Sequence, residues 1–582
     1  MSRLKISLPS FVRQQYVWNV ATEEATVFAR ANLSGREERI LKNVEAGFAR
    51  DSKSRTIFFL PVAPEARLFV KRYKIYNWLE RLKSFFFVSK AAWEYEMQRY
   101  LKAHNIPVAR PVATLEVKNW GFLKESFLFL TELKNVTTLK EFITGKLGFK
   151  RGNGWIKEKQ SLLKKLAELV RSLHLAGFYH EDLHLGNILI EKEGDIPKLY
   201  LADLHQARRC GMGSARKIRN LAQLCYSLNA VLPLTDVARF LTYYRSLDLR
   251  KETLKPFIQK VFSAMAKVRH QHLQSRSRRC LKKSSGFNIE RYGKLRIYHP
   301  RLGGVDRIKE LITQHRRLVS QHPEQLFKAT PKRLISIQTF LSGERCYLKE
   351  YRYSMWRVLE SLLGRHPARS EWLAAHGLAV RRVKAPDGLA LVEEKVVFFT
   401  KRAYVIFKEV QSAIPSGQYA LETFGGHITP DALVFKKAYL KSFARAISHL
   451  HQRGIFHADL KANNILVRSN PVRSSETTNP GFRTPNSELT ADWSFYFLDL
   501  DRVRFERAVG WKEKVKNLSQ LNAATPAALS RTDRLRFFDY YLTAFQPVNP
   551  AQRKQIIRRI MKITIARHHF WPPKAKSVPG HR

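Results

Sequence analysis

Apolar residues at intervals of three and four predict one long amphipathic helix in each half of the chain. The first carries Leu162, Leu166, Leu169 and Leu173, and the second carries Leu440, Phe443, Ile447 and Leu450. Because an α-helix has 3.6 residues per turn, each set forms one buried face. Each helix is followed by a Gly, a polar segment and a short aliphatic run, residues 188–190 and 465–467, that predicts a strand. The same order of elements in both halves suggests an internal repeat.

Strand patterns also occur before each amphipathic helix. Residues 56–60 are β-branched and aromatic and stop at a Pro, which is typical of a strand. Lys71 follows apolar residues in the next predicted strand, and Lys349 does so in the second half; each precedes an aromatic residue by two positions. A Lys of this kind is either a solvated strand residue or a cation for a bound phosphate, and the strands alone leave both interpretations open.

The polar segment after each amphipathic helix has the form His-x-Asp-Leu-x-x-x-Asn in both halves. It places Asp182 five residues before Asn187, and Asp459 five residues before Asn464. This is the catalytic-loop signature of kinases, in which the Asp orients the attacking hydroxyl and the Asn holds a metal ion on the nucleotide phosphates. The alternative is a loop merely capped by its own side chains, and the repetition argues against it.

A second carboxylate for Mg²⁺ is expected downstream in an apolar strand. Asp203, in Leu-Ala-Asp-Leu-His, and Asp499, in Phe-Leu-Asp-Leu-Asp, fit this position. The separation from strand Lys to loop Asp is 111 residues in the first copy (71 to 182) and 110 in the second (349 to 459). This agreement indicates a duplication and makes Lys71 and Lys349 the candidate cations for the nucleotide's α and β phosphates.

A kinase pairs that Lys with a Glu on the following helix. In the first copy Glu94 is the best candidate, and Glu96 is a nearby competitor. In the second copy Glu371 matches best, because its distance to a following Leu equals that of Glu94. An alignment through the Ala-His pairs of the two helices would instead place His366 there, so this assignment stays open.

The His that begins each polar segment, His180 or His457, is expected to support the loop backbone and not to act as a base. Two residues after the loop Asp the copies differ, with His184 in the first and Lys461 in the second. A Lys at this place reaches a transferring phosphoryl group as a point charge, or it is a solvated loop cation. The sequence does not separate these two roles.

Neither copy has a G-x-G-x-x-G loop before its Lys, which departs from protein kinases. The pattern resembles instead the lipopolysaccharide kinase family, which phosphorylates core sugars (heptose or Kdo). The resemblance rests on residues 70–73, 180–187, 203–205, 348–351, 457–464 and 499–502.

The resemblance implies an α+β fold with two tandem protein-kinase-like bilobal domains. Each domain would have a small, mostly β lobe and a larger helical lobe, with ATP and Mg²⁺ between the lobes. The implied reaction is transfer of a phosphoryl group to a sugar hydroxyl of the lipopolysaccharide core. The implied site residues are Asp182 and Asp459 for catalysis, Lys71, Glu94, Lys349 and Glu371 for the nucleotide, and Asn187, Asp203, Asn464 and Asp499 for the metal.

The length of 582 residues favours two domains, since a single core rarely grows beyond about 250 to 300 residues. A basic run, residues 267–283, marks the junction, so the predicted domains are 1–280 and 281–582. The run is either a solvated linker or a basic strap that contacts an anion.

The second copy is longer after its catalytic loop. The segment from loop Asp to metal Asp measures 40 residues in the second copy (459 to 499) and 21 in the first (182 to 203). A flexible insertion at about 468–493, rich in Ser, Thr, Asn and Pro, accounts for the difference. The basic, Pro-containing tail from about 571 is predicted to be disordered.

The chain has 103 Lys and Arg against 49 Asp and Glu, a net charge of +54, which implies attraction to a polyanion or an anionic membrane. Zinc-finger spacing, an aromatic RNA-recognition signature and a basic helix with heptads are all missing from the sequence, which argues against nucleic acid. A phosphorylated glycolipid on the anionic inner membrane surface satisfies both charge and kinase motif. The apolar residues 78–88, with basic flanks, either pack in the core or enter a membrane interface.

Apolar stretches of about eighteen residues or more do not occur, and the N-terminus lacks the apolar region of a secretory signal. The expected location is cytoplasmic, with peripheral attachment to the inner membrane. Four Cys without C-x-x-C spacing indicate neither a zinc site nor a disulfide framework. Two other functions stay open: a kinase of a protein or another small hydroxylated substrate, and a kinase-like scaffold that binds an anionic membrane.

Overall fold

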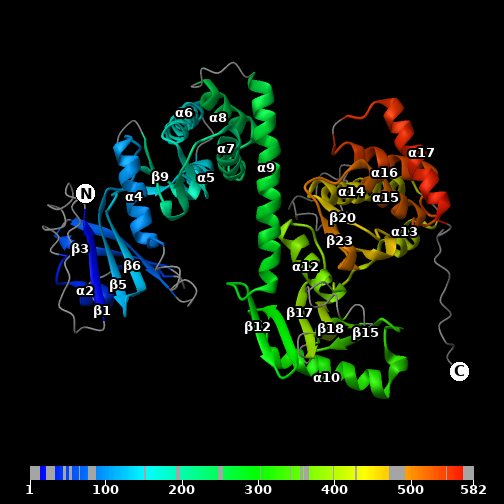
Figure 1. Ribbon diagram of the computed structural model, residues 1–582. Helices are drawn as coiled ribbons and strands as arrows, with labels where there is room; N and C mark the ends of the chain where they lie inside the picture. Colours follow the sequence, from blue (N-terminus) through cyan, green and yellow to red (C-terminus); the bar gives the residue numbers. More distant parts are fainter. Residues whose placement is uncertain are drawn as a thin grey trace, which may run out of the picture. The chain divides into compact units, whose positions relative to one another are not determined.

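The chain divides into two compact units, Met1–Arg269 and His270–Arg582, in the computed structural model (Figure 1). Each unit has a sheet lobe and a helical lobe. Most of the predicted insertion, the predicted tail and most of residues 78–88 lie outside the described residues. The structure describes residues 14–20, 33–42, 47–51, 55–64, 66–75, 87–149, 153–191, 197–246, 253–301, 303–340, 343–353, 358, 366–396, 399–426, 429–470, 492–545 and 547–567.

A six-stranded antiparallel sheet, in the order β1-β5-β6-β4-β3-β2, forms the sheet lobe of the first unit. The residues of β3 alternate between buried and partly exposed, as expected of a strand with one face on a core. Helix α4 begins at a cap in which the Ser89 side chain accepts a hydrogen bond from the Ala92 N–H. The elements are β1 (Gln14–Val20), α2 (Glu37–Lys42), β2 (Gly47–Asp51), β3 (Arg55–Ala63), β4 (Ala66–Lys74), α4 (Lys90–Ala103), β5 (Pro111–Asn119) and β6 (Phe122–Thr131).

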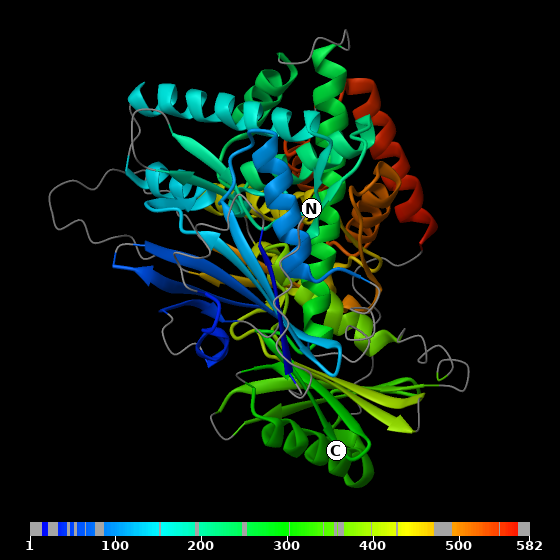
Figure 2. The same ribbon diagram turned by 60° about the vertical axis from the view of Figure 1, so that its left-hand side comes forward.

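The helical lobe of the first unit is built around α6, which is drawn in cyan in Figure 2. The four Leu residues predicted to form its buried face, Leu162, Leu166, Leu169 and Leu173, are all buried in one core cluster. The elements of this lobe are β7 (Val136–Thr138), α5 (Leu139–Phe149), α6 (Asn153–Leu175), β8 (Phe178–His180), η2 (Leu185–Asn187), β9 (Ile188–Glu191), β10 (Lys198–Leu201), η3 (Leu204–Gln206), β11 (Ala207–Arg209), α7 (Ser214–Leu228), α8 (Leu234–Ser246) and α9 (Leu254–Ser277).

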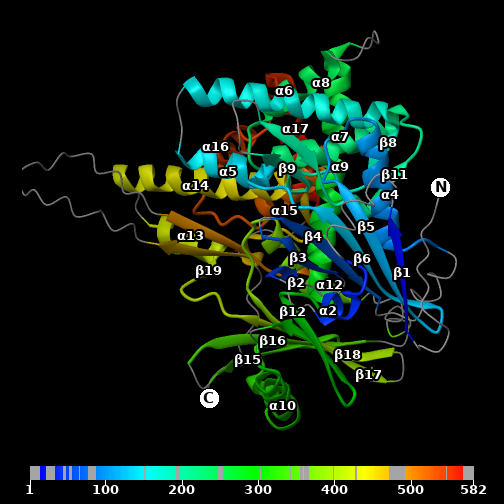
Figure 3. The ribbon, with the colours of Figure 1, turned by 90° about the vertical axis from the view of Figure 1, so that its left-hand side faces the viewer.

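The second unit repeats the sheet of the first and adds to it. Its sheet has the order β12-β13-β17-β18-β16-β15-β14, so β14-β15-β16-β18-β17 match β2-β3-β4-β6-β5. Helix α10 packs on this sheet, as Figure 3 shows. The elements of this lobe are β12 (Phe287–Tyr292), β13 (Leu295–Pro300), α10 (Val305–Gln321), η5 (Pro323–Gln325), β14 (Lys328–Thr330), β15 (Arg333–Thr339), β16 (Arg345–Arg352), α12 (Pro367–Val380), β17 (Gly388–Val396) and β18 (Phe399–Lys408).

The helical lobe of the second unit contains the second amphipathic helix, α14, whose predicted apolar face is buried. None of the helices in the described ranges is long and apolar enough to cross a membrane. The elements are β19 (Ile414–Pro415), α13 (Ser416–Phe424), α14 (Pro430–Gln452), β20 (Ile455–His457), η6 (Ala462–Asn464), β21 (Ile465–Asn470), β22 (Asp492–Phe497), η7 (Leu500–Arg502), β23 (Val503–Phe505), α15 (Trp511–Ala523), α16 (Arg531–Leu542) and α17 (Pro550–Ala566).

The basic run 267–283 is helical over most of its length. It comprises the end of α9 and η4 (Arg278–Leu281), and the division between the units falls after Arg269, within α9. The end of the run packs into the second unit, because buried Arg381 donates to the Ser277 hydroxyl and Trp372 donates to the carbonyl of residue 280. Residues 277–280 therefore belong to a packed core and do not form a solvated linker.

Candidate active sites

Each predicted catalytic loop connects a short strand to a 3₁₀ turn. In the first unit the loop lies between β8 and η2, and in the second between β20 and η6. The side-chain amide of Asn187 donates to the main-chain carbonyl of Asp182 at 3.0 Å, and that of Asn464 donates to the carbonyl of Asp459 at 2.8 Å. The structure therefore brings each predicted Asp and Asn together, and the bond fixes the Asn nitrogen so that its oxygen is the atom presented to an ion.

The buried rings of His180 and His457 hold the loop in place. Each ring accepts a hydrogen bond from the backbone N–H of the loop Asp, at 3.2 and 3.3 Å. The other ring nitrogen contacts the carbonyl of the residue before the downstream Asp, Ala202 or Leu498. Burial lowers the pKa of both imidazoles. A neutral imidazole thus connects the catalytic loop to the segment that carries the second carboxylate.

The two downstream carboxylates, Asp203 and Asp499, have left-handed backbone conformations, with φ of 62° and 55°. Non-glycine residues rarely adopt this region, and such strain is concentrated at functional sites. The nearest oxygen of each carboxylate lies 3.8 Å from the Nζ atom of the predicted strand Lys, Lys71 or Lys349. Residues more than 130 positions apart in the chain are thereby placed in one site.

Each strand Lys forms a short ion pair with the helix Glu that best fitted the sequence. The Nζ–Oε1 distance is 2.6 Å for both Lys71–Glu94 and Lys349–Glu371. The Glu carboxylates are buried, and each accepts a further hydrogen bond from a Tyr hydroxyl two residues after the Lys. Glu94 also accepts from the Leu204 N–H at 3.1 Å, which ties the helix to the segment after Asp203.

The two competing candidates lie elsewhere. Glu96 forms a 3.8 Å ion pair with Arg99 on the partly exposed side of α4. His366 is the N-cap of α12, where its Nδ1 atom accepts from the Arg369 N–H and its Nε2 atom lies 3.0 Å from Glu393. It stands where Ser89 caps α4 in the first unit.

An Arg in each unit completes the site, and the sequence analysis missed it. Arg55, the first residue of β3, contacts Asp203 at 2.6 Å, and Arg333, the first residue of β15, contacts Asp499 at 2.8 Å. Each Arg precedes its strand Lys by sixteen residues (55 to 71 and 333 to 349). This equal spacing in the two copies was the signal that could have found them.

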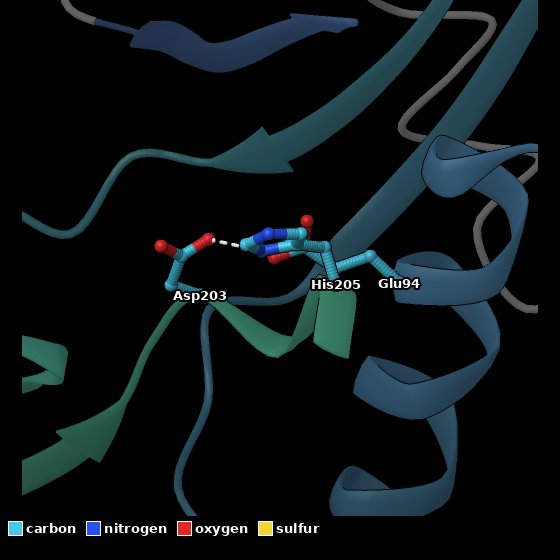
Figure 4. A group of neighbouring side chains, drawn as sticks. All are labelled: Glu94, Asp203 and His205. Carbon is cyan, nitrogen blue, oxygen red and sulfur yellow. Dashed lines mark hydrogen bonds and ion pairs between the residues drawn. The ribbon is translucent and has the colours of Figure 1, made fainter. Parts of the chain in front are cut away.

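The units differ two residues after each key Asp. In the first unit His205 lies 2.8 Å from Asp203, as Figure 4 shows, and His184 lies 3.5 Å from Asp182. In the second unit Asp501 stands in place of His205, and it lies 3.4 Å from Arg333.

Glu94, Asp203 and His205 offer ligand atoms within 4.8 Å of one another. The ion pair of Glu94 with Lys71 leaves Asp203, together with Asn187, as the oxygen donors that fit a hard cation. In the second unit Asp499 and Asn464 are the corresponding donors. Both donor sets thus fit the ion that kinases hold on nucleotide phosphates.

The surrounding cations favour the ionised form of the two downstream carboxylates. Burial alone would raise the pKa of Asp203, but the hydrogen bond with His205 and the charges of Lys71 and Arg55 hold it far below its usual range. The pKa of Asp499 is also lowered, because the charges of Lys349 and Arg333 offset the cost of burial. Ionised carboxylates surrounded by cations are suited to bind a metal ion with an anionic ligand.

The second unit has two further charged contacts. Burial and the neighbouring Asp499 charge raise the pKa of Asp501. Lys461 lies 2.9 Å from the catalytic-loop carboxylate of Asp459. In the first unit the corresponding carboxylate, Asp182, has a lowered pKa, chiefly through its hydrogen bond with His184.

The model of the Lipopolysaccharide kinase (Kdo/WaaP) family matches residues 68–244 and 336–541. This chain belongs to the lipopolysaccharide kinase family. It is therefore a kinase, and the family matches in both halves confirm the predicted α+β fold with two tandem kinase-like domains. Each matched region of this lipopolysaccharide kinase contains a strand Lys, a catalytic loop and a downstream Asp, whereas both Arg residues precede the matched regions.

The solved structures similar to this lipopolysaccharide kinase include "WaaP in complex with acyl carrier protein", with 19% identity, coverage of 44% of this chain and 97% of that chain, and a TM-score of 0.33. The BubR1 kinase domain has 9% identity, with coverage of 46% and 85% and a TM-score of 0.27. A comparison with curated proteins found no match.

Proposed function

We propose that this protein transfers the terminal phosphoryl group of ATP, bound with Mg²⁺, to a sugar hydroxyl of the lipopolysaccharide core. The observation that carries the proposal is the duplicated site, in which a strand Lys lies between a buried Glu and a downstream Asp in each half of a chain of this family. The substrate class comes from the family, and the reaction type comes from the geometry together with the family.

In this proposal Lys71 and Lys349 bind the α and β phosphates, and their Glu partners hold them in position. Mg²⁺, held by the Asn and downstream Asp of each unit, would neutralise charge on the phosphates. Asp182 and Asp459 orient the acceptor hydroxyl and take its proton. The catalytic contribution of the protein is therefore mostly positioning and electrostatic stabilisation, as in other phosphoryl transfer.

The test is transfer of labelled phosphate from Mg²⁺-ATP to purified lipopolysaccharide core by the full chain. Asp182→Asn and Asp459→Asn are made singly and together, because Asn keeps the shape and cannot take a proton. We expect the double variant to lose roughly 10²-fold to 10⁴-fold in rate. Arg67→Ala, which removes an exposed ion pair with Glu132, is the control and should keep the wild-type rate.

Three results would contradict the proposal. Full activity in the double variant would exclude the two loop Asp residues from catalysis. Transfer to a protein or another small hydroxylated substrate, with none to the glycolipid, would favour a kinase with a different acceptor. Failure of the wild-type chain to bind Mg²⁺-ATP would favour a scaffold role.

We also propose peripheral attachment to the cytoplasmic face of the inner membrane. The net charge of +54 supports it, since a basic protein is attracted to anionic lipid. Sedimentation with vesicles of anionic lipid should fall steeply as salt rises from about 50 to 500 mM, because salt screens the attraction. Equal binding to neutral vesicles would contradict an electrostatic attachment.

A further inference from the structure

Two cations share one carboxylate oxygen in each unit. Arg55 and Lys71 lie 2.6 and 3.8 Å from Oδ1 of Asp203. In the second unit the corresponding Arg and Lys lie 2.8 and 3.8 Å from Oδ1 of Asp499. The two Arg side chains are only 24% and 22% exposed, so their positions are restricted. In each unit the Arg therefore lies closer to this carboxylate than the strand Lys does.

These Arg residues stand at a particular point of the sheet. Each is the first residue of the second strand of a hairpin, β2–β3 or β14–β15, and follows the turn at the place where protein kinases have the Gly-rich loop that covers the phosphates. Around this hairpin neither copy has the G-x-G-x-x-G pattern. In the second unit the Thr330 hydroxyl accepts from the Arg333 N–H at 3.0 Å and donates to its carbonyl, which fixes the Arg backbone at the turn.

The charge at this point explains what the Arg can bind. A divalent ion on Asp203 adds two positive charges beside Arg55 and Lys71, and the carboxylates of Asp203 and Glu94 balance only two of these four charges. The triphosphate of ATP supplies the missing negative charge. A guanidinium presents a planar fork of N–H donors that matches phosphate oxygens, with a geometry that a Lys does not have.

We propose that Arg55 and Arg333 bind the β and γ phosphates of ATP, each passing from its Asp carboxylate to the phosphates when the divalent ion binds that carboxylate. The two Arg side chains would cover the phosphates, as the Gly-rich loop does in protein kinases. This inference rests on the proposed use of Mg²⁺-ATP, and it adds a second phosphate-binding cation to each site.

The test measures binding, not turnover. The full chain carrying Arg55→Ala and Arg333→Ala together is titrated with Mg²⁺-ATP and, separately, with adenosine, by calorimetry or by displacement of a fluorescent nucleotide. We expect Mg²⁺-ATP affinity to fall about tenfold to a hundredfold, the range for a hydrogen-bonded charged pair, while adenosine affinity is unchanged. Arg→Lys at both positions should restore only part of the affinity.

The matched control is Arg67→Ala with Arg345→Ala, which removes one Arg from each sheet at its ion pair with Glu132 or Glu409. It should bind both ligands like the wild type. Unchanged or tighter Mg²⁺-ATP binding in the Arg55 and Arg333 variant would overturn the inference, and so would an equal loss for ATP and adenosine. Failure of the wild type to bind Mg²⁺-ATP would overturn the proposed function itself.

Discussion

The two kinase-like units have the same nucleotide-side geometry and differ beside their key carboxylates. Lys–Glu distances of 2.6 Å and Lys–Asp distances of 3.8 Å occur in both. Two residues after the loop Asp and the downstream Asp, however, the first unit has His184 and His205, whereas the second has Lys461 and Asp501. Geometry that recurs in both halves is what nucleotide binding requires. The residues that differ can give each site its own response to pH or to the acceptor.

The first unit places an imidazole beside each of its two Asp carboxylates, whereas the second has Lys461 and Asp501 at the same positions. Histidine is the side chain whose charge changes most readily between pH 5 and 8. We therefore expect the activities of the two units to depend differently on pH, even though both units have the same Lys–Glu and Lys–Asp distances.

The largest effect is expected from variants that remove the Lys–Glu pair common to both units. Lys71→Met leaves the fully buried carboxylate of Glu94 without its cation, which costs about 3–5 kcal/mol of folding free energy for a buried pair. Lys349→Met should cost less, because the Lys349 side chain is 15% exposed and that of Lys71 only 6%. Chemical denaturation of the full chain measures both, with Arg67→Met as the exposed control. Equal small losses, below about 1 kcal/mol, would show that the Tyr hydroxyls hold the Glu without Lys.

The next largest effect concerns a Glu that is buried in the sheet lobe of the second unit and partly exposed in that of the first. Glu393 of β17 and Glu116 of β5 pair with equivalent residues of the neighbouring strand, but Glu393 is fully buried against His366 and Glu116 is partly exposed. Burial alone would raise the pKa of Glu393, yet the hydrogen bond and charge of His366 lower it to about 2. A carboxylate with a lowered pKa stabilises the folded state above its ordinary pKa, and the stabilisation is lost as pH falls from about 4.5 to 2.

The second unit should therefore lose about 3 kcal/mol of stability across this acid range through Glu393. Glu393→Gln should flatten that part of the acid unfolding curve, whereas Glu116→Gln should leave it unchanged. Tryptophan fluorescence during acid titration measures the transition. An identical acid curve for wild type and Glu393→Gln would mean that the buried pair contributes nothing to the pH dependence.

The sequence predicted the fold, and it predicted most of the residues that the structure brings together in each candidate site, because these residues follow local patterns. The loop motif and the Lys strand have fixed spacings that survive in both copies, so the order of elements could be read without coordinates. The choice between Glu371 and His366 as the partner of Lys349 needed the three-dimensional structure. Glu371 pairs with Lys349, whereas His366 is a helix cap. Arg55 and Arg333 were not predicted, because the register of a hairpin decides which of 103 basic residues faces the carboxylate.

The smallest expected effect concerns the residues two positions after the loop Asp. With the second unit silenced by Asp459→Asn, His184→Ala removes the hydrogen bond that lowers the pKa of Asp182, so that pKa returns towards 3.8. The acid limb of kcat/KM for the first unit should then shift to higher pH, by less than about one pH unit because Asp182 is well exposed.

The last prediction concerns the second unit, with the first silenced by Asp182→Asn. The variant Lys461→His replaces the Lys ammonium with an imidazole, whose positive charge is ordinarily lost as pH rises through about 6.5. Its activity should fall a few-fold between pH 6 and 8, whereas the parent with Lys461 stays level; the same profile in both would show that Lys461 is a solvated loop cation.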